Sequence, residues 1–220
     1  MIKFGNTFVN FGGTYLTGVH VNYNDIPPNT IRVKFSSGYT PTMGDTQTIV
    51  DSVENIWDIY KQNNNWYRLF KNNNNLLEVL GSNTIGITSM SEVFSNCSSL
   101  NSVQNFNTLD ITDIDGMFSY CTSLTTVSLF NTSKVIYMTD VFRGCSSLTT
   151  VPLFDTSSVY NMSYMFYECL NVESGALALY RQASTQTTPP SVHSLTFYQC
   201  GKNTQTGAAE LAQIPTNWKF

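Results

Sequence analysis

The chain is poor in charged residues. Asp, Glu, Lys and Arg make up 12% of its 220 residues, about half the share that is usual in soluble proteins. Its 11 Lys and Arg residues are scattered and the formal net charge is -4, so the basic surface of a nucleic-acid-binding protein is not expected. Uncharged polar residues must cover the surface instead, as in the Asn-rich segment 61–75.

Long apolar segments are missing as well. No run approaches the roughly 20 apolar residues of a membrane-spanning helix, so no membrane insertion is expected. Residues 1–16, MIKFGNTFVNFGGTYL, carry one Lys but no continuous apolar stretch after it, so we expect no secretory signal there. If the protein works outside a cell, it would have to leave by another route.

Patterns typical of catalysis or metal binding are scarce. The cysteines lack the close pairing of zinc ligands, and the two histidines are His20 and His193. His193 and Cys200 lie seven residues apart without an evident oxyanion-stabilising group, which favours a structural role for both. In segment 110–118, Ile111 stands where a calcium loop needs its first acidic ligand, and the distal Glu is absent. The sequence therefore predicts no cofactor and no enzymatic activity.

The chain does contain an internal repeat. Cys97, Cys121, Cys145 and Cys169 follow one another at steps of 24 residues. The other apolar positions that recur at this step are Ile87, Ile111, Val135 and Val159; Met90, Ile114, Met138 and Met162; Val93, Met117, Val141 and Met165; Phe94, Phe118, Phe142 and Phe166; and Leu100, Leu124, Leu148 and Val172. A fixed period of this length indicates a repeat architecture.

Less regular copies flank these four repeats. Residues 66–79 follow the pattern with Trp66 in the Met position and Asn73 in the Cys position. At the other end, the segment TFYQCG around Cys200 resembles MFYECL around Cys169. We therefore expect one degenerate repeat on each side of the four regular ones.

Each repeat has two parts with different periodicities. In residues 135–145, VIYMTDVFRGC, apolar residues at i, i+3, i+6 and i+7 predict a helical or 3₁₀ segment. Residues 148–154, LTTVPLF, are short and rich in Thr and Val, which matches the strand of a leucine-rich repeat. Since one repeat cannot bury its apolar side alone, the repeats must stack, with their strands in a parallel sheet.

The repeats resemble the leucine-rich repeats of the BspA-like surface-protein family. The segments that carry the resemblance are VYNMSYMFYECL, residues 159–170, and CSSLTTVPLFDTS, residues 145–157. It covers about 83–180 and, less closely, 61–210. It implies an α/β leucine-rich-repeat solenoid with a non-catalytic role in adhesion or attachment. Such proteins occur on gut bacteria and in the phages that infect them.

The expected organisation has three parts. Residues 1–60 are a β-rich N-terminal cap or attachment region, with strands in KFGNTFVNF, TYLTGVHVNYN and TIRVKFSS and either a strand pair or a short helix in 46–60. Residues 61–180 form the solenoid. Residues 181–220 form a C-terminal capping region, and two short helices are expected in 175–184 and 207–218.

The five cysteines could have three roles. They are Cys97, Cys121, Cys145, Cys169 and Cys200. One Cys per repeat gives a column rather than a metal-binding cluster. Disulfides between successive repeats are conceivable, but side chains in such a column run parallel, and five is an odd number. The favoured interpretation is a structural column of buried free thiols that pack as small apolar residues.

The row of Phe106, Phe130 and Phe154 could be internal or exposed. Strict alternation from Val127 puts Leu129 inside and Phe130 outside. The Phe is the same in all three repeats, however, which favours a bulge or turn that brings the rings into the core. An exposed aromatic stripe is the alternative.

Candidate binding residues are positions that vary between repeats while their neighbours stay fixed. They are Gln104, Ser128 and Pro152 on the strand half, and Tyr120, Tyr137, Arg143, Asn161, Tyr164 and Tyr167 on the other half. Tyr provides a large contact area at low entropic cost. For any single one of these residues, ordinary solvated surface is the plainer interpretation.

The predicted function is that of a non-catalytic phage virion protein, in a tail, fibre or other structural or attachment part. Its partner would be a protein or a cell-surface glycan, with other virion proteins as neighbours and homo-oligomerisation compatible with such a part. Its location would be the virion or, alternatively, the bacterial cell surface. A BspA-like adhesin and an intracellular protein-binding scaffold are the alternative functions.

Overall fold

The computed structural model describes residues 2–4, 7–9, 26–62, 65–104, 106 and 108–220. It contains a mixed β-sheet and two α-helices, in agreement with the expected α/β class. Near the N-terminus, β1 (Ile2–Phe4) and β2 (Thr7–Val9) pair in antiparallel fashion. The strand expected in TYLTGVHVNYN, residues 14–24, lies outside the described residues.

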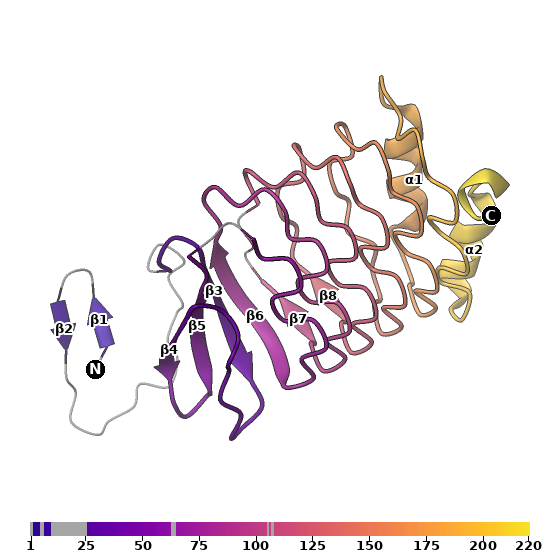
Figure 1. The fold of residues 1–220 in the computed structure, drawn as a ribbon. Coiled ribbons are helices and arrows are strands. Elements are labelled where there is room, and N and C mark those ends of the chain that lie inside the picture. Colours follow the sequence, from indigo (N-terminus) through magenta and orange to yellow (C-terminus); the bar gives the residue numbers. More distant parts are fainter. Residues whose placement is uncertain (1, 5–6, 10–25, 63–64, 105, 107) are drawn as a thin grey trace.

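The main sheet has six strands in the order β4-β5-β3-β6-β7-β8 (Figure 1). The strands are β3 (Thr30–Phe35), β4 (Thr46–Asp51), β5 (Ile56–Tyr60), β6 (Leu76–Asn83), β7 (Ser102–Val103) and β8 (Thr126–Val127). Segment 46–60 is thus a strand pair. β3 pairs antiparallel with β5 and β6, whereas β6, β7 and β8 run parallel, with Val79, Val103 and Val127 in register.

Beyond β6 the chain winds into coils that lie side by side along the molecule (Figure 1). Parallel backbone bridges join Ser89 to Asp113, Asp113 to Tyr137 and Tyr137 to Asn161, so each coil takes 24 residues. The next bridge joins Asn161 to Val192, a step of 31 residues. Helix α1 (Ala176–Thr185) lies within this longer step.

The segments predicted to be helical or 3₁₀ are neither, and that part of the prediction is wrong. The N–H groups of Met90, Glu92, Phe94 and Asn96 donate to carbonyls of the next coil at 2.8–3.0 Å. The N–H groups between them, on Val93, Ser95 and Cys97, donate three residues back within their own coil. A helix would use nearly every N–H within its own segment. Tight turns satisfy the same apolar spacing and leave alternate N–H groups to join the coils.

These turns place two residues of each coil in the left-handed region. One column comprises Arg68, Glu92, Gly116, Asp140 and Tyr164, with φ between 55° and 62°. The other comprises Asn72, Asn96, Tyr120, Gly144 and Glu168, with φ between 58° and 69°. A side chain other than Gly is held there at a cost, which the hydrogen bonds between coils offset.

The core consists of the recurrent apolar positions. Its most regular feature is a stack formed by Phe70, Phe94, Phe118, Phe142, Phe166 and Phe197, with neighbouring ring centroids 5.2–6.0 Å apart and ring planes within 15° of parallel. At one end of the stack, the ring centroid of Phe35 in β3 lies 6.4 Å from that of Phe70. At the other end, the ring centroid of Trp218 lies 6.2 Å from that of Phe197. The stack thus connects the antiparallel strands to the C-terminal segment.

The second Phe row is internal. Phe106, Phe130 and Phe154 are at most 7% exposed, whereas Leu129 is 63% exposed. Because β8 ends at Val127, alternation does not continue to Phe130, and the chain turns that ring inward. The interpretation based on the unvarying Phe is confirmed, and the exposed aromatic stripe is excluded.

The C-terminal segment contains the two short helices that were expected, α1 and α2 (Gln205–Gln213), followed by a 3₁₀ turn, Thr216–Trp218. His193 stacks on Trp218 at 4.1 Å between ring centroids. Among the described residues, no helix has both the length and the apolar character needed to cross a membrane.

All five cysteines are buried with free thiols. The thiols of Cys97, Cys121, Cys145 and Cys169 each donate to the carbonyl of the Phe 27 residues earlier, at 3.0–3.1 Å. The thiol is therefore a hydrogen-bond donor between coils as well as a small apolar group. Burial raises the pKa of every thiol, to about 12 for Cys97.

These raised pKa values predict alkaline instability. Above the ordinary thiol pKa of about 8.5, the unfolded chain loses thiol protons that the folded chain retains. The thiols' contribution to the free energy of unfolding should be constant below that pH and then fall, by at most about 1.4 kcal/mol per pH unit for each thiol. Urea denaturation between pH 7 and 10.5 measures the slope.

Cys145→Ala is the matched control. It should lower the free energy of unfolding by a few kcal/mol at most. Above the ordinary thiol pKa, that free energy should also fall less steeply with pH, by the contribution of one thiol. The same slope in the variant and in the parent chain would contradict the assignment.

Candidate functional site

Four of the predicted binding residues meet on the exposed face formed by the turns. The guanidinium carbon of Arg143 lies 4.8 Å from the ring centroid of Tyr167, 5.4 Å from that of Tyr164 and 5.8 Å from that of Tyr120. These distances lie within the range in which a cation is attracted to an aromatic ring. The tyrosine–arginine cluster is defined as these four residues together with Tyr198.

Tyr198 is the member that the sequence interpretation missed. Its ring stacks on Tyr167 at 4.8 Å between centroids, with 18° between the ring planes. The similarity of TFYQCG to MFYECL could have revealed it, because Tyr198 occupies the place of Tyr167. The cluster therefore continues into the degenerate C-terminal repeat.

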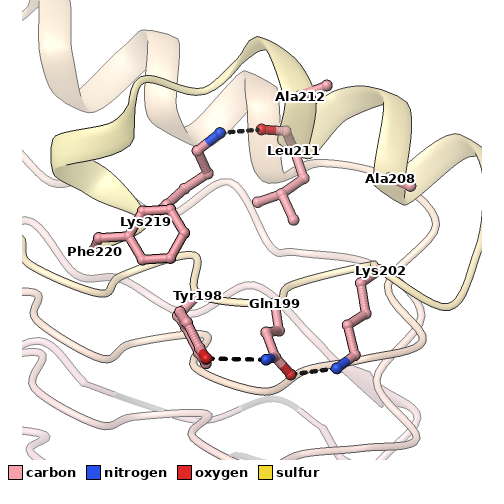
Figure 2. Close-up of a pocket in the computed structure, with 8 residues that line it drawn as sticks. All are labelled: Tyr198, Gln199, Lys202, Ala208, Leu211, Ala212, Lys219 and Phe220. Carbon is pink, nitrogen blue, oxygen red and sulfur yellow. Dashed lines mark hydrogen bonds between the residues drawn. The ribbon is translucent and has the colours of Figure 1, made fainter.

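Polar and aromatic neighbours fix the position of Tyr198. Gln199 Nε2 donates to the Tyr198 hydroxyl at 3.0 Å, and the Phe220 ring meets Tyr198 edge-on at 5.8 Å. Figure 2 shows Tyr198, Gln199 and Lys202 joined by hydrogen bonds below Phe220. They line a hollow of about 410 Å³ at the C-terminal end of the face.

Asp140 helps to position Arg143, because its Oδ1 accepts a hydrogen bond from Arg143 Nη1 at 3.2 Å. Burial raises the pKa of Asp140, and the nearby Arg143 charge opposes that rise. In the two preceding coils the place of Arg143 is taken by Ser119 and Ser95. Arg143 thus brings a charge to a place where those coils carry only a hydroxyl.

Tyr120 lies flat because Gly144 is beneath it. A Cβ atom at Gly144 would come within 2.6 Å of Tyr120 Cδ1. Gly144 also has φ +69°, a conformation that favours Gly. The Tyr120 ring therefore rests one side on the backbone, while the residue remains 40% exposed.

At the N-terminal end of the same face the charges are paired with one another. Glu92 accepts hydrogen bonds from Arg68 Nε and Nη2, both at 3.0 Å, and it also pairs with Lys71. These hydrogen bonds, those from Arg68 foremost, lower the pKa of Glu92 to about 2. The Arg68 guanidinium lies 4.5 Å from the Tyr67 ring centroid.

The other predicted residues lie apart from the cluster. Tyr137 and Asn161 are bridged to each other along the coil edge, and Tyr137 is 45% exposed. Gln104 and Ser128 are exposed on the strand side. Pro152 is buried, so its selection as a binding residue was wrong. A residue type can vary between repeats because the side chain faces solvent, but also because the packing around a buried position differs from coil to coil.

Among the residues that the structure describes, no three His, Cys, Asp or Glu side chains lie close enough together to hold a metal ion. The raised thiol pKa values make the cysteines poor nucleophiles, because the thiolate is the reactive form.

A family model described as "Mycoplasma protein of unknown function, DUF285" matches residues 64–179, and the chain belongs to this family. The match supports the BspA-like part of the resemblance, whereas the link to phages and gut organisms stays a prediction. No curated protein sequence matches the chain.

Two solved structures are similar to parts of the chain. One is a leucine-rich repeat protein from Eubacterium ventriosum ATCC 27560, with 22% identity and a TM-score of 0.36 over 54% of this chain and 28% of that one. The other is the T. pallidum leucine-rich repeat protein TpLRR, with 13% identity and a TM-score of 0.32 over 66% of this chain and 90% of that one. The chain thus spans 28% of the length of the Eubacterium ventriosum protein.

The contact between Gly144 and Tyr120 predicts a specific loss of stability. Gly144→Ala should lower the free energy of unfolding by about 1–3 kcal/mol, because Ala is strained at positive φ and its Cβ would displace the ring. In the double variant with Tyr120→Asn the displaced ring is absent, so the cost should be smaller than the sum of the two single changes. Urea denaturation of the four chains measures this coupling, and strict additivity would show that the ring does not rest on Gly144.

Proposed function

We propose that the chain is a non-catalytic attachment protein that presents the tyrosine–arginine cluster to a partner. In this proposal the coils form a leucine-rich-repeat solenoid, closed by the antiparallel strands β3–β5 at one end and by α1 and α2 at the other. The observation that carries the proposal is that three tyrosine rings surround one arginine on the turn face and a fourth stacks on one of them.

The composition of the cluster suits binding. Tyr and Arg are over-represented among the residues that carry most of the free energy of protein interfaces. The Tyr167 ring already contacts the rings of Tyr164 and Tyr198, so little side-chain entropy would be lost on binding. Arg143 keeps its ion pair with Asp140, which limits the cost of removing its charge from water.

The cluster is also built on regular backbone. Tyr120 and Tyr164 stand in the two left-handed columns, where hydrogen bonds to neighbouring coils fix the backbone. A contact surface built on such rigid elements is more precisely placed than one on a long loop. This arrangement favours recognition of a partner with a fixed shape.

The proposed location is a phage virion, where the protein would belong to a tail, fibre or other attachment part. The resemblance of the repeats to those of phages of gut bacteria supports this location. A BspA-like adhesin on the bacterial surface is the alternative, and the cluster would have the same role there.

Replacement of two partly exposed tyrosines tests the role of the cluster. In the variant Tyr164→Asn/Tyr167→Ser, the purified chain should bind cells of the source culture about tenfold more weakly or worse, because two aromatic rings of the cluster are lost. Flow cytometry with labelled protein measures this. Asn tolerates the positive φ of Tyr164, and Ser occurs at the Tyr167 place in two other coils, so the melting temperature should stay close to that of the parent chain.

Tyr137→Asn is the matched control, since Asn161 occupies the same place in the next coil. This variant should bind as the parent does. Undiminished binding by the double variant would exclude the cluster as the attachment site.

The location is tested by proteomics on gradient-purified virus particles, with the host envelope fraction analysed alongside. We expect the chain to be enriched with the particles at a fixed copy number per particle. Its recovery in the envelope alone would assign it to the bacterial surface instead.

A further inference from the structure

A polar groove of about 480 Å³ runs across the turn face and shares Tyr120 and Arg143 with the tyrosine–arginine cluster. Tyr67 lines it in the first coil and Tyr120 two coils further on, with Asn96, Asp115 and Ser119 among the residues between them and Asp140 in the coil beyond Tyr120. Its volume lies within the range of small-molecule sites, but its lining is more polar than is usual for them. The groove thus holds two partly exposed aromatic rings, two coils apart, with polar groups between and beyond them.

The two rings are partly exposed to a ligand. Tyr120 rests against Gly144 and has the Arg143 guanidinium 5.8 Å from its ring centroid, and the residue is 40% exposed. Tyr67 is 47% exposed, with the Arg68 guanidinium over its ring. Flat aromatic surfaces pack well against the C–H groups on one side of a sugar ring.

The groups between the rings can both donate and accept hydrogen bonds. The hydroxyls of Ser95 and Ser119 and the amide of Asn96 make no side-chain hydrogen bond with any other described residue, and all three line the groove. Asp115 accepts hydrogen bonds from Thr139, among them one from its N–H at 2.6 Å, and its carboxyl group has further lone pairs. A ligand with many hydroxyl groups would satisfy such a mixed set.

Both cations that line the groove are paired, whereas the Asp115 carboxyl has no ion-pair partner among the described residues. Lys71 pairs with Glu92, and Arg143 pairs with Asp140. No cation in the groove is left without an acidic partner among the described residues to attract a phosphate, a sulfate or a nucleic acid. The groove therefore does not favour an anionic ligand, and its uncharged hydrogen-bonding groups suit a neutral one.

We infer that this groove binds a neutral carbohydrate chain, with sugar rings on Tyr67 and Tyr120 and sugar hydroxyls bonded to the polar groups between them. The inference rests on the proposed attachment function and specifies the chemistry of its partner. The carbohydrate is either a bacterial polysaccharide or a host mucosal glycan.

The test is a glycan array probed with the full-length chain. Its neutral arm carries mannan, dextran, galactan and desialylated mucin, and its anionic arm carries hyaluronate, heparin and sialylated mucin. We expect retention on the neutral arm, and the polysaccharide and mucin spots distinguish the two sources. Retention on the anionic arm alone, or on no glycan at millimolar concentration, would overturn the inference.

Groove variants then test the site by isothermal titration with the glycan that the array identifies. Tyr120→Asn should weaken binding about tenfold, whereas Tyr120→Phe should change it less than about threefold, because the ring remains. Asn96→Asp lies outside the tyrosine–arginine cluster and should also weaken binding, since it removes an amide donor and adds a charge. Asn72 and Asn96 show that Asn is tolerated in the column of Tyr120.

Tyr137→Asn, outside the groove, should bind the glycan as the parent does. An unchanged dissociation constant for both Tyr120→Asn and Asn96→Asp would place the sugar elsewhere. If attachment to cells depends on Tyr164 and Tyr167 but no glycan binds, this inference fails and the proposed function stands. If the glycan binds but the chain does not attach to cells, the proposed function fails alone.

Discussion

The structure depends on an alternation of backbone hydrogen bonds. Along each turn segment, one N–H bonds back into its own coil and the next bonds to the carbonyl of the following coil, as with Val93 and Phe94. The first kind of bond sets the tight turn, and the second fixes the register at 24 residues. Positive φ at Glu92 and Asn96 is the local cost of this arrangement. It is offset because the backbone groups of the segment find partners without a helix or a long strand.

That register explains the side-chain rows. When each coil repeats the backbone of the one before it, equivalent side chains lie above one another, and a residue that fits once fits in every coil. Phenylalanine forms the continuous ring stack, and cysteine adds a small group whose thiol bonds the carbonyl of the preceding coil. Buried threonines bond in the other direction, to the following coil, as Thr132 does when it donates to the carbonyl of Asp155 at 2.8 Å. The ring stacks and side-chain hydrogen bonds between equivalent positions therefore stabilise the core in addition to the burial of apolar area.

Much of the interior could be predicted from the sequence, because burial follows directly from the period. The rows around Phe94 and Cys97, and the inward position of Phe130, came from comparing repeats. The helix prediction failed because apolar spacing reports which side chains face inward, and a helix and a series of turns give the same spacing. Four of the five cluster residues were candidates, but their convergence on Arg143 depends on turn geometry that no residue pattern specifies. Pro152 was wrong because variation between repeats does not distinguish a changed packing environment from exposure.

The 24-residue step also sets a unit of length on the outer face. Adjacent coils are spaced like neighbouring strands, about 4.8 Å apart, so two side chains in equivalent rows are separated by whole multiples of that distance. Tyr67 and Tyr120 belong to coils two steps apart. Insertion or loss of a complete repeat between them would change their separation by one unit and leave each local environment intact. The separation of two binding side chains on this surface can therefore change only in steps of one coil spacing. The fold that carries them stays the same.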